Sequence, residues 1–109
     1  TRFTLTLSNG KPSMLYALIC TDKPGALQTR LDNREAHLAF LKGMGNGLKA
    51  AGPFLDDDGN MTGSLVVIEA ANRDGALAIS EEDPYAKAGL FESVEIRPWN
   101  WVVKNPENA

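Results

Sequence analysis

The chain has 109 residues and a formal net charge of −3, with 43% hydrophobic and 23% charged residues. This length allows one domain with a single hydrophobic core, and the composition is typical of a soluble globular protein. The charge argues against a nucleic-acid-binding protein, because binding to phosphates needs clustered Lys and Arg. The apolar runs are far shorter than the roughly 20 residues of a membrane-spanning helix, so we also expect no membrane partner.

The counts of cysteine and histidine limit the chemistry of the chain. Cys20 is the single cysteine and His37 the single histidine, which excludes an intrachain disulfide and leaves too few ligands for a zinc-type site. A haem or flavin site is weakly supported, since one histidine is not enough and no Gly-rich phosphate loop is present. We therefore expect no metal and no cofactor, a buried and unreactive Cys20, and a cytoplasmic protein.

The first 13 residues differ from the rest of the chain. They contain no apolar segment of the signal-peptide type. Phe3, Leu5 and Leu7 alternate with threonines, as in a strand. Residues 1–13 are therefore expected to be either an added extension upstream of the domain or an extra edge strand.

The next segments predict a strand followed by a long helix. Residues 14–20 (MLYALIC) are an apolar strand, and the Pro and Gly of 22–27 (DKPGAL) interrupt the pattern. Asp32 with Glu35 has the spacing of a capping box, so we expect the helix to begin there. The helix is predicted to continue to about Ala51.

A hairpin is predicted in the middle of the chain. Gly52 and Pro53 should end the helix, and Phe54 and Leu55 can begin a second strand. Residues 56–60 (DDDGN) are rich in turn-forming types. They lead into a third strand, which we place at 63–70 (GSLVVIEA).

The remaining segments predict a second helix and a last strand. Asn72 or Asp74 opens the helix, which runs through residue 79. A short turn or helix after Pro84, within residues 81–89, connects it to a strand at 91–103. The domain is thus predicted to span 14–103, with a C-terminal tail at 104–109.

The order β-α-β-β-α-β predicts an α+β protein with the ferredoxin-like fold and a four-stranded antiparallel sheet. Two helices cover only one face of such a sheet, yet the strands at 14–20 and 63–70 are apolar on both sides. A large apolar face left in water marks an interface. We therefore predict a homodimer that packs sheet face against sheet face, with further assembly of dimers left open.

His37 lies in the segment REAHLAFL, within the predicted helix. At about 100° per residue it falls in the apolar arc with Leu41, and Arg34 shares that surface. Two interpretations stay open: a half-buried core histidine bonded to a backbone carbonyl, or an imidazole that faces a cavity. Proximity to the helix N-terminus and to Arg34 would favour the neutral imidazole, which can accept a proton.

A histidine base needs a partner that fixes its tautomer, usually a carboxylate. The acidic residues of 56–58 have the pattern of a solvated turn and lack the ligand spacing of a calcium loop. Asp83 precedes Pro84, so its backbone conformation is restricted and its side chain is held in a defined direction. It is either that partner or an Asx cap that initiates the turn.

Several motifs together are similar to those of the YciI-like (YCII) family. They are MLYALICTDKPGALQTRL, REAHL, AGPF, TGSLVV and EEDPYAKAGLFESVEIRPW, and the resemblance covers about residues 14 to 103. The resemblance implies a ferredoxin-like chain that forms a dimeric α/β barrel. It also implies a cleft with a catalytic His–Asp pair, which corresponds to His37 and Asp83 here.

The same resemblance implies a substrate-binding pocket around this pair. The matching positions are Arg30, Arg34, Gly52, Pro53, Ser64 and Tyr85. The two arginines would suit an anionic or phenolate substrate. The loop DDDGNM between AGP and TGS is shorter than in many relatives, which affects pocket closure and substrate size.

The resemblance implies proton transfer on a small ring or phenolic compound, of the elimination or isomerisation type. A related dehydrochlorinase acts on a chlorinated hydroxyhydroquinone, and muconolactone isomerases share the barrel. The alternative is a non-catalytic metabolite-binding or regulatory module, and a hydrogen-bonded His37–Asp83 pair open to a cavity would distinguish the two. In a third alternative the chain is part of a larger complex, with Trp99 and Trp101 as contacts. Such tryptophans more often pack at the dimer interface, which is the interpretation we favour for them.

Overall fold

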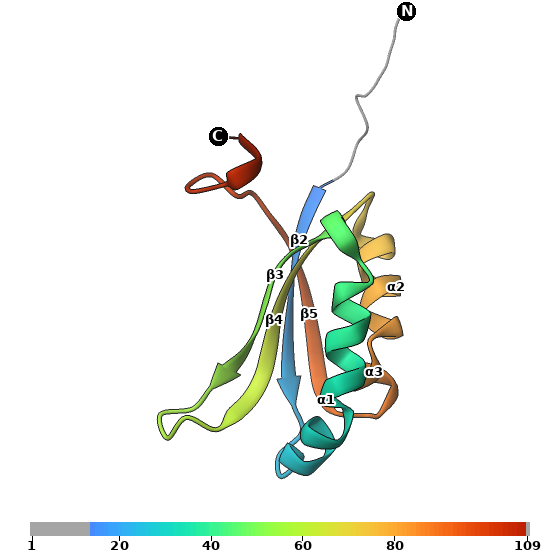
Figure 1. Ribbon diagram of the computed structural model, residues 1–109, viewed down its shortest axis with the longest axis vertical. Coiled ribbons are helices and arrows are strands. Elements are labelled where there is room, and N and C mark those ends of the chain that lie inside the picture. The colour runs from blue at the N-terminus through green and yellow to red at the C-terminus, as the bar shows by residue number, and fades with distance from the viewer. Residues whose placement is uncertain (1–13, 109) are drawn as a thin grey trace, which may run out of the picture.

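The computed structural model describes residues 14–108, which form one sheet with helices packed on one of its faces (Figure 1). The predicted extension or edge strand at 1–13 lies outside the described residues. No helix in the described part of the chain is both long enough and apolar enough to cross a membrane.

The sheet has four antiparallel strands in the order β3-β4-β2-β5. Their bounds are Met14–Asp22 for β2, Leu48–Leu55 for β3, Met61–Ala70 for β4 and Phe91–Trp99 for β5. In the centre of the sheet, Leu18 pairs with Val66 on one side and with Ile96 on the other.

Three α-helices connect the strands: α1 Leu27–Lys42, α2 Arg73–Glu82 and the single turn α3 Pro84–Lys87. Two short 3₁₀ segments, η1 Gly45–Gly47 and η2 Pro106–Asn108, complete the described elements. The element order is the predicted ferredoxin-like α+β arrangement, with α3 as a short addition before the last strand.

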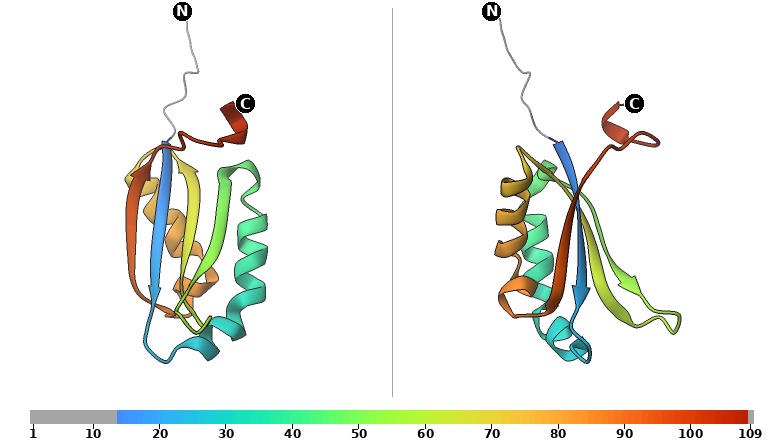
Figure 2. Two further views of the ribbon diagram at one scale, coloured as in Figure 1. Left: turned by 90° about the vertical axis from the view of Figure 1, so that its left-hand side faces the viewer. Right: turned by 180° about the vertical axis from the view of Figure 1, so that it is seen from behind.

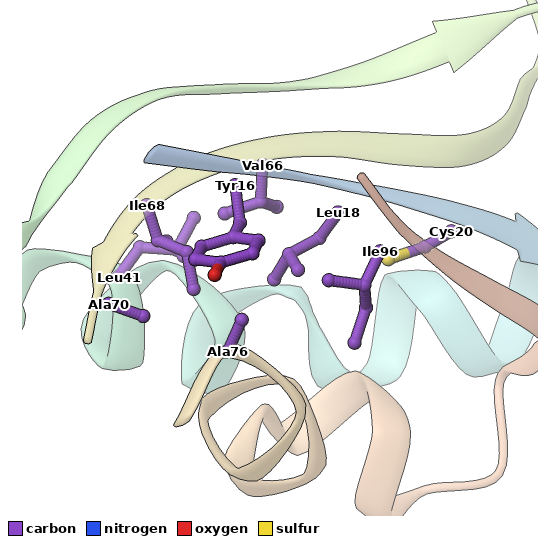
Figure 3. Packing of buried hydrophobic residues seen from close by; sticks show 9 residues of the cluster. All are labelled: Tyr16, Leu18, Cys20, Leu41, Val66, Ile68, Ala70, Ala76 and Ile96. Carbon is purple, nitrogen blue, oxygen red and sulfur yellow. The ribbon is translucent and has the colours of Figure 1, made fainter. Parts of the chain in front are cut away.

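The core lies between the helices and the facing side of the sheet (Figure 3). Ile68 and Ala76 are completely buried there, and Tyr16 and Leu18 are nearly so. Leu41 of α1 reaches into the same cluster. Alternate residues of β2 and β4 thus anchor both long helices, because side chains alternate between the two faces of a strand.

The predicted start of α1 is wrong. The helix begins at Leu27, and its N-cap residue Ala26 makes no side-chain capping hydrogen bond. Gly25 has φ +72°, so the turn formed by Pro24 and Gly25 leads directly into the helix. Asp32 lies inside the helix, where its carboxylate accepts a hydrogen bond from Gln28 Nε2 at 2.8 Å.

The predicted end of α1 and start of β3 are also wrong. The helix ends at Lys42, and Gly45, with φ +57°, separates it from a strand that begins at Leu48. Gly52 and Pro53 therefore lie within β3 rather than after a helix. Proline is tolerated there because β3 is an edge strand and need not donate to a second neighbour.

The other boundaries differ by smaller amounts. Asn72 caps α2, accepting a hydrogen bond from the Gly75 backbone N–H at 2.8 Å, which confirms one of the two predicted starts. The last strand ends at Trp99 rather than at residue 103. Beyond it the chain turns back, and Glu107 forms an ion pair with Lys49. The rings of Trp99 and Trp101 lie 5.7 Å apart.

The face of the sheet opposite the helices is uncovered in the single chain (Figure 2, left). Leu15, Ala17 and Ile19 of β2 and Leu65 of β4 are half-buried on this side. Trp99 has an exposed fraction of 42%. At the outer strand β5 the residues become charged, and Arg97 lies 3.8 Å from Glu95. The apolar part of the open face therefore runs along the two central strands.

Candidate active site

One face of α1 supplies three of the predicted site residues. Arg30, Arg34 and His37 are spaced by four and three positions, which places them on the same side of a helix. Arg30 and His37 are buried, with exposed fractions of 2% and 6%. Arg34 is exposed.

His37 is farther from the helix N-terminus than the sequence suggested. Because α1 begins at Leu27, the histidine lies about three turns into the helix. The field of the helix dipole falls off within the first turn. The N-terminus of α1 is therefore too far away to act on the imidazole, and the groups around the ring decide its chemistry.

Asp83 occupies the junction between α2 and α3. Its backbone is extended, with φ −62° and ψ 128°, and it ends one helix and caps the next. Its Oδ1 accepts a hydrogen bond from the Tyr85 backbone N–H at 2.9 Å. His37 Nδ1 lies 2.9 Å from Oδ1 and 3.0 Å from Oδ2 of the same carboxylate. The cap and the histidine partner, predicted as alternatives, are thus the same group.

This contact fixes the tautomer of His37. A carboxylate can only accept hydrogen bonds, so Nδ1 carries the proton that it donates to Asp83. Nε2 is then the ring nitrogen with a free lone pair. The partner of the buried histidine is a side chain rather than a backbone carbonyl, which is the arrangement of a general base with an orienting carboxylate.

The ring of Tyr85 stacks on the face of the His37 imidazole. The two rings are parallel to within 13°, with centroids 3.9 Å apart. Phe91 packs edge-on against Tyr85 at 6.1 Å. Burial raises the pKa of the Tyr85 hydroxyl, although the charges of Arg30 and Arg34 act in the opposite direction. The phenol therefore stays neutral beside the histidine.

Arg30 is engaged by a residue that the sequence analysis missed. Its Nε donates to Asp22 Oδ2 at 2.8 Å and its Nη2 donates to Asp22 Oδ1 at 2.9 Å. Nη2 also donates to Ser64 Oγ at 2.9 Å. Burial lowers the pKa of this guanidinium, but the ion pair with Asp22 raises it, so Arg30 remains charged.

Asp22 could have been found from the strand pattern. It extends by one position the alternation of Leu18 and Cys20, which face the helices. An acidic residue on the helix-facing side of a strand requires a partner. The turn-forming sequence DKPG concealed this signal, because it assigned the aspartate to a loop.

A pocket of about 190 Å³ lies between α1 and the strands β3 and β4. The predicted residues Arg30, Arg34, His37, Gly52, Pro53, Ser64 and Tyr85 all line it. Asp83 does not line the pocket and is connected to it by its hydrogen bond with His37. The remaining walls are largely apolar, with Leu38 and Leu41 from the helix and Val66 from β4.

Gly63, which precedes Ser64 in the TGS motif, permits the close approach of β4 to β2. A Cβ at this position would overlap the carbonyl oxygen of Cys20. Cys20 itself is buried, and burial raises the pKa of its thiol to about 12. The thiol is therefore protonated at neutral pH. In the described part of the chain no group of three or more His, Cys, Asp or Glu side chains could hold a metal ion.

The buried ion pair between Arg30 and Asp22 predicts a large loss of stability when one partner is removed. Asp22→Asn leaves the guanidinium buried without a counter-charge, and we expect the free energy of unfolding to fall by about 3–5 kcal/mol. Urea denaturation measures the change. The control is Glu82→Gln, whose pair with Lys87 is exposed and contributes about 0–1 kcal/mol. Equal losses in the two variants would contradict the assignment.

Comparison with known proteins places the chain in a family. The family model described as the YCII-related domain matches residues 14–100. Protein YciI of Escherichia coli O6:H1 is 37% identical over 97 residues, covering 82% of this chain and 99% of the relative. An uncharacterized protein of Haemophilus influenzae is 36% identical, with the same coverage.

Solved structures agree with this placement. 5-Chloro-2-hydroxyhydroquinone dehydrochlorinase (TftG) from Burkholderia phenoliruptrix AC1100, in complex with 2,5-dihydroxybenzoquinone, has a TM-score of 0.75 and 38% identity, covering 84% of this chain and 99% of that one. A putative antibiotic biosynthesis monooxygenase from Bacteroides thetaiotaomicron, at 9% identity and a TM-score of 0.54 with 87% and 94% covered, shares the fold alone. The ferredoxin-like arrangement is that of the dimeric α/β barrel proteins, and the chain belongs to the YCII-related family.

Proposed function

We propose that the protein is an enzyme that transfers a proton on a small ring or phenolic compound, with His37 as the base and Asp83 as its orienting partner. The observation that carries the proposal is the 2.9 Å contact between His37 Nδ1 and the Asp83 carboxylate beside a pocket that His37 lines. A base within a fixed hydrogen-bonded pair and open to a cavity is the geometry expected of proton transfer.

The chemistry follows from the tautomer. Nε2 of His37 takes a proton from the substrate, and Asp83 stabilises the imidazolium that forms. In an elimination the electron pair of the broken bond becomes a ring double bond, and the leaving group departs as an anion. In an isomerisation the proton returns from Nε2 to another ring atom. Neither step needs an oxidant or a reductant.

The size and lining of the pocket suit a single ring. A volume of about 190 Å³ accommodates one substituted six-membered ring, and apolar side chains of α1 and β4 line much of it. The related dehydrochlorinase acts on 5-chloro-2-hydroxyhydroquinone and is seen with 2,5-dihydroxybenzoquinone. We extend this substrate class, hydroxylated and chlorinated rings, to the present protein.

The open face of the sheet supports the second part of the proposal, a homodimer formed by two such faces. Half-buried Leu15, Ala17, Ile19 and Leu65 form a continuous apolar surface along the two central strands. Exposed apolar surfaces of this kind are typical of interfaces. The helices already cover the other face, so a second copy is the natural cover for this one (Figure 2).

Turnover of chlorinated hydroxyhydroquinones tests the roles of the pair. We expect His37→Gln to lower kcat by about 10²–10⁴-fold, because the proton acceptor is lost. Asp83→Asn should lower kcat by about 10²-fold or more, since an amide can still cap the α3 turn but cannot stabilise an imidazolium. Chloride release and the absorbance of the quinone product measure the rate.

The matched control is Glu35→Gln, on the exposed side of the same helix, which should retain full activity. Full turnover by His37→Gln would contradict the proposal. Tight binding of ring compounds with no turnover of any of them would also contradict it, and would favour a metabolite-binding module instead.

The dimer predicts a different response to charge on the two faces of the molecule. Ile19→Lys places an ammonium group on the open sheet face, and we expect it to convert the dimer to monomers. The control Leu77→Lys lies on the exposed side of α2 and should leave the dimer intact. Light scattering after gel filtration measures the mass. A wild-type mass equal to one chain would contradict this part of the proposal.

A further inference from the structure

The two arginines of the pocket are in different electrostatic states, although both lie on the same face of α1. We propose that the pocket selects ring anions that carry a second ring oxygen, with Arg34 binding the anionic oxygen and the Ser64 hydroxyl donating to the other. This inference rests on the proposed function, because it names the substrate class of the same site.

Arg30 is not available as the receptor of a substrate anion. Its charge is compensated by Asp22, which accepts from both Nε and Nη2. The pair is almost completely buried, with side-chain exposed fractions of 3% and 6%. The guanidinium carbon also lies 4.7 Å from the centre of the Tyr85 ring. Arg30 therefore has a structural role in the pocket, through its hydrogen bonds to Asp22 and Ser64, and contributes no net charge to it.

Arg34 has the opposite properties. It lies one helical turn farther along α1, is exposed and lines the pocket. Within residues 14–108 no carboxylate is paired with it. Its charge acts inside the pocket, since it opposes the rise in the pKa of the buried Tyr85 hydroxyl. Arg34 is thus the uncompensated cation of the site and binds an anionic oxygen by a charge-assisted hydrogen bond.

Ser64 supplies the second point of recognition. Its side chain is buried, with a residue exposed fraction of 3%, and lines the pocket. Its oxygen accepts a hydrogen bond from Arg30 Nη2, so the hydroxyl proton must point elsewhere. Among the described residues no acceptor receives that proton. Buried hydroxyl groups are normally satisfied, so a bound ligand is the expected acceptor.

Arg30 also makes Ser64 a better donor. A hydroxyl that accepts a hydrogen bond from a cation is polarised, and its own proton is donated more strongly. The buried ion pair of Arg30 and Asp22 therefore acts on the substrate through Ser64. His37 and apolar side chains line the rest of the same pocket, which fits the body of a ring.

Binding of 2,5-dihydroxybenzoquinone, measured by calorimetry, tests the inference. We expect Arg34→Gln to weaken binding by about 10–100-fold and to flatten its dependence on salt, since a charge-assisted contact is lost. Arg34→Lys should recover part of the affinity. Ser64→Ala should weaken binding by about 5–10-fold without a change in salt dependence. Hydroquinone, a neutral ring, should be insensitive to Arg34→Gln.

The controls separate this inference from the proposed function. Glu35→Gln, next to Arg34 on the outer side of α1, should leave the affinity within twofold of wild type. His37→Gln should retain binding of the anion while losing turnover, so failure of catalysis does not imply failure of recognition. Unchanged affinity in Arg34→Gln, or an equal loss for the anion and for hydroquinone, would overturn the assignment.

Discussion

The contact between Asp83 and His37 is the interaction on which the rest of the site depends. It joins residues 46 positions apart and connects α1 to the junction of α2 and α3. The same carboxylate caps α3 through the Tyr85 N–H, and that cap places the tyrosine ring against the imidazole. One aspartate therefore fixes the histidine twice, through a hydrogen bond in the ring plane and through a stacked ring on its face. In the proposed proton transfer, a base held in this way would lose little entropy on reaction.

The buried ion pair of Arg30 and Asp22 has a comparable structural role on the other side of the pocket. It connects α1 to the end of β2 and fixes the orientation of the helix about its own axis. That orientation directs His37 toward the pocket and leaves Arg34 at its open side. His37 and the exposed Arg34 are therefore both positioned by helix α1, which a buried charge pair anchors to the sheet.

The sequence predicted the order of strands and helices better than the residues at which they begin and end. The alternation of strands and helices was enough for the ferredoxin-like order, because apolar periodicity is strong in β2 and β4. The start of α1 was misplaced because the capping pattern at Asp32 is common inside helices, whereas the true start at Leu27 has no side-chain cap. Pro53 misled the assignment of β3, since only the edge position of that strand, a property of the whole sheet, makes proline acceptable. Similarly, the family motifs named residues that line the pocket, but Asp22 was missed, because the turn-forming sequence DKPG assigned it to a loop.

The tautomer of His37 is the property that most directly tests the account. Because the chain has a single histidine, its imidazole signals need no sequence-specific resonance assignment. Long-range ¹⁵N–¹H NMR of the imidazole distinguishes a protonated nitrogen from one with a free lone pair. The account predicts, for the neutral ring, a protonated Nδ1 and an unprotonated Nε2, with this preference lost in Asp83→Asn. A neutral ring protonated at Nε2, or a tautomer unaffected by Asp83→Asn, would contradict it.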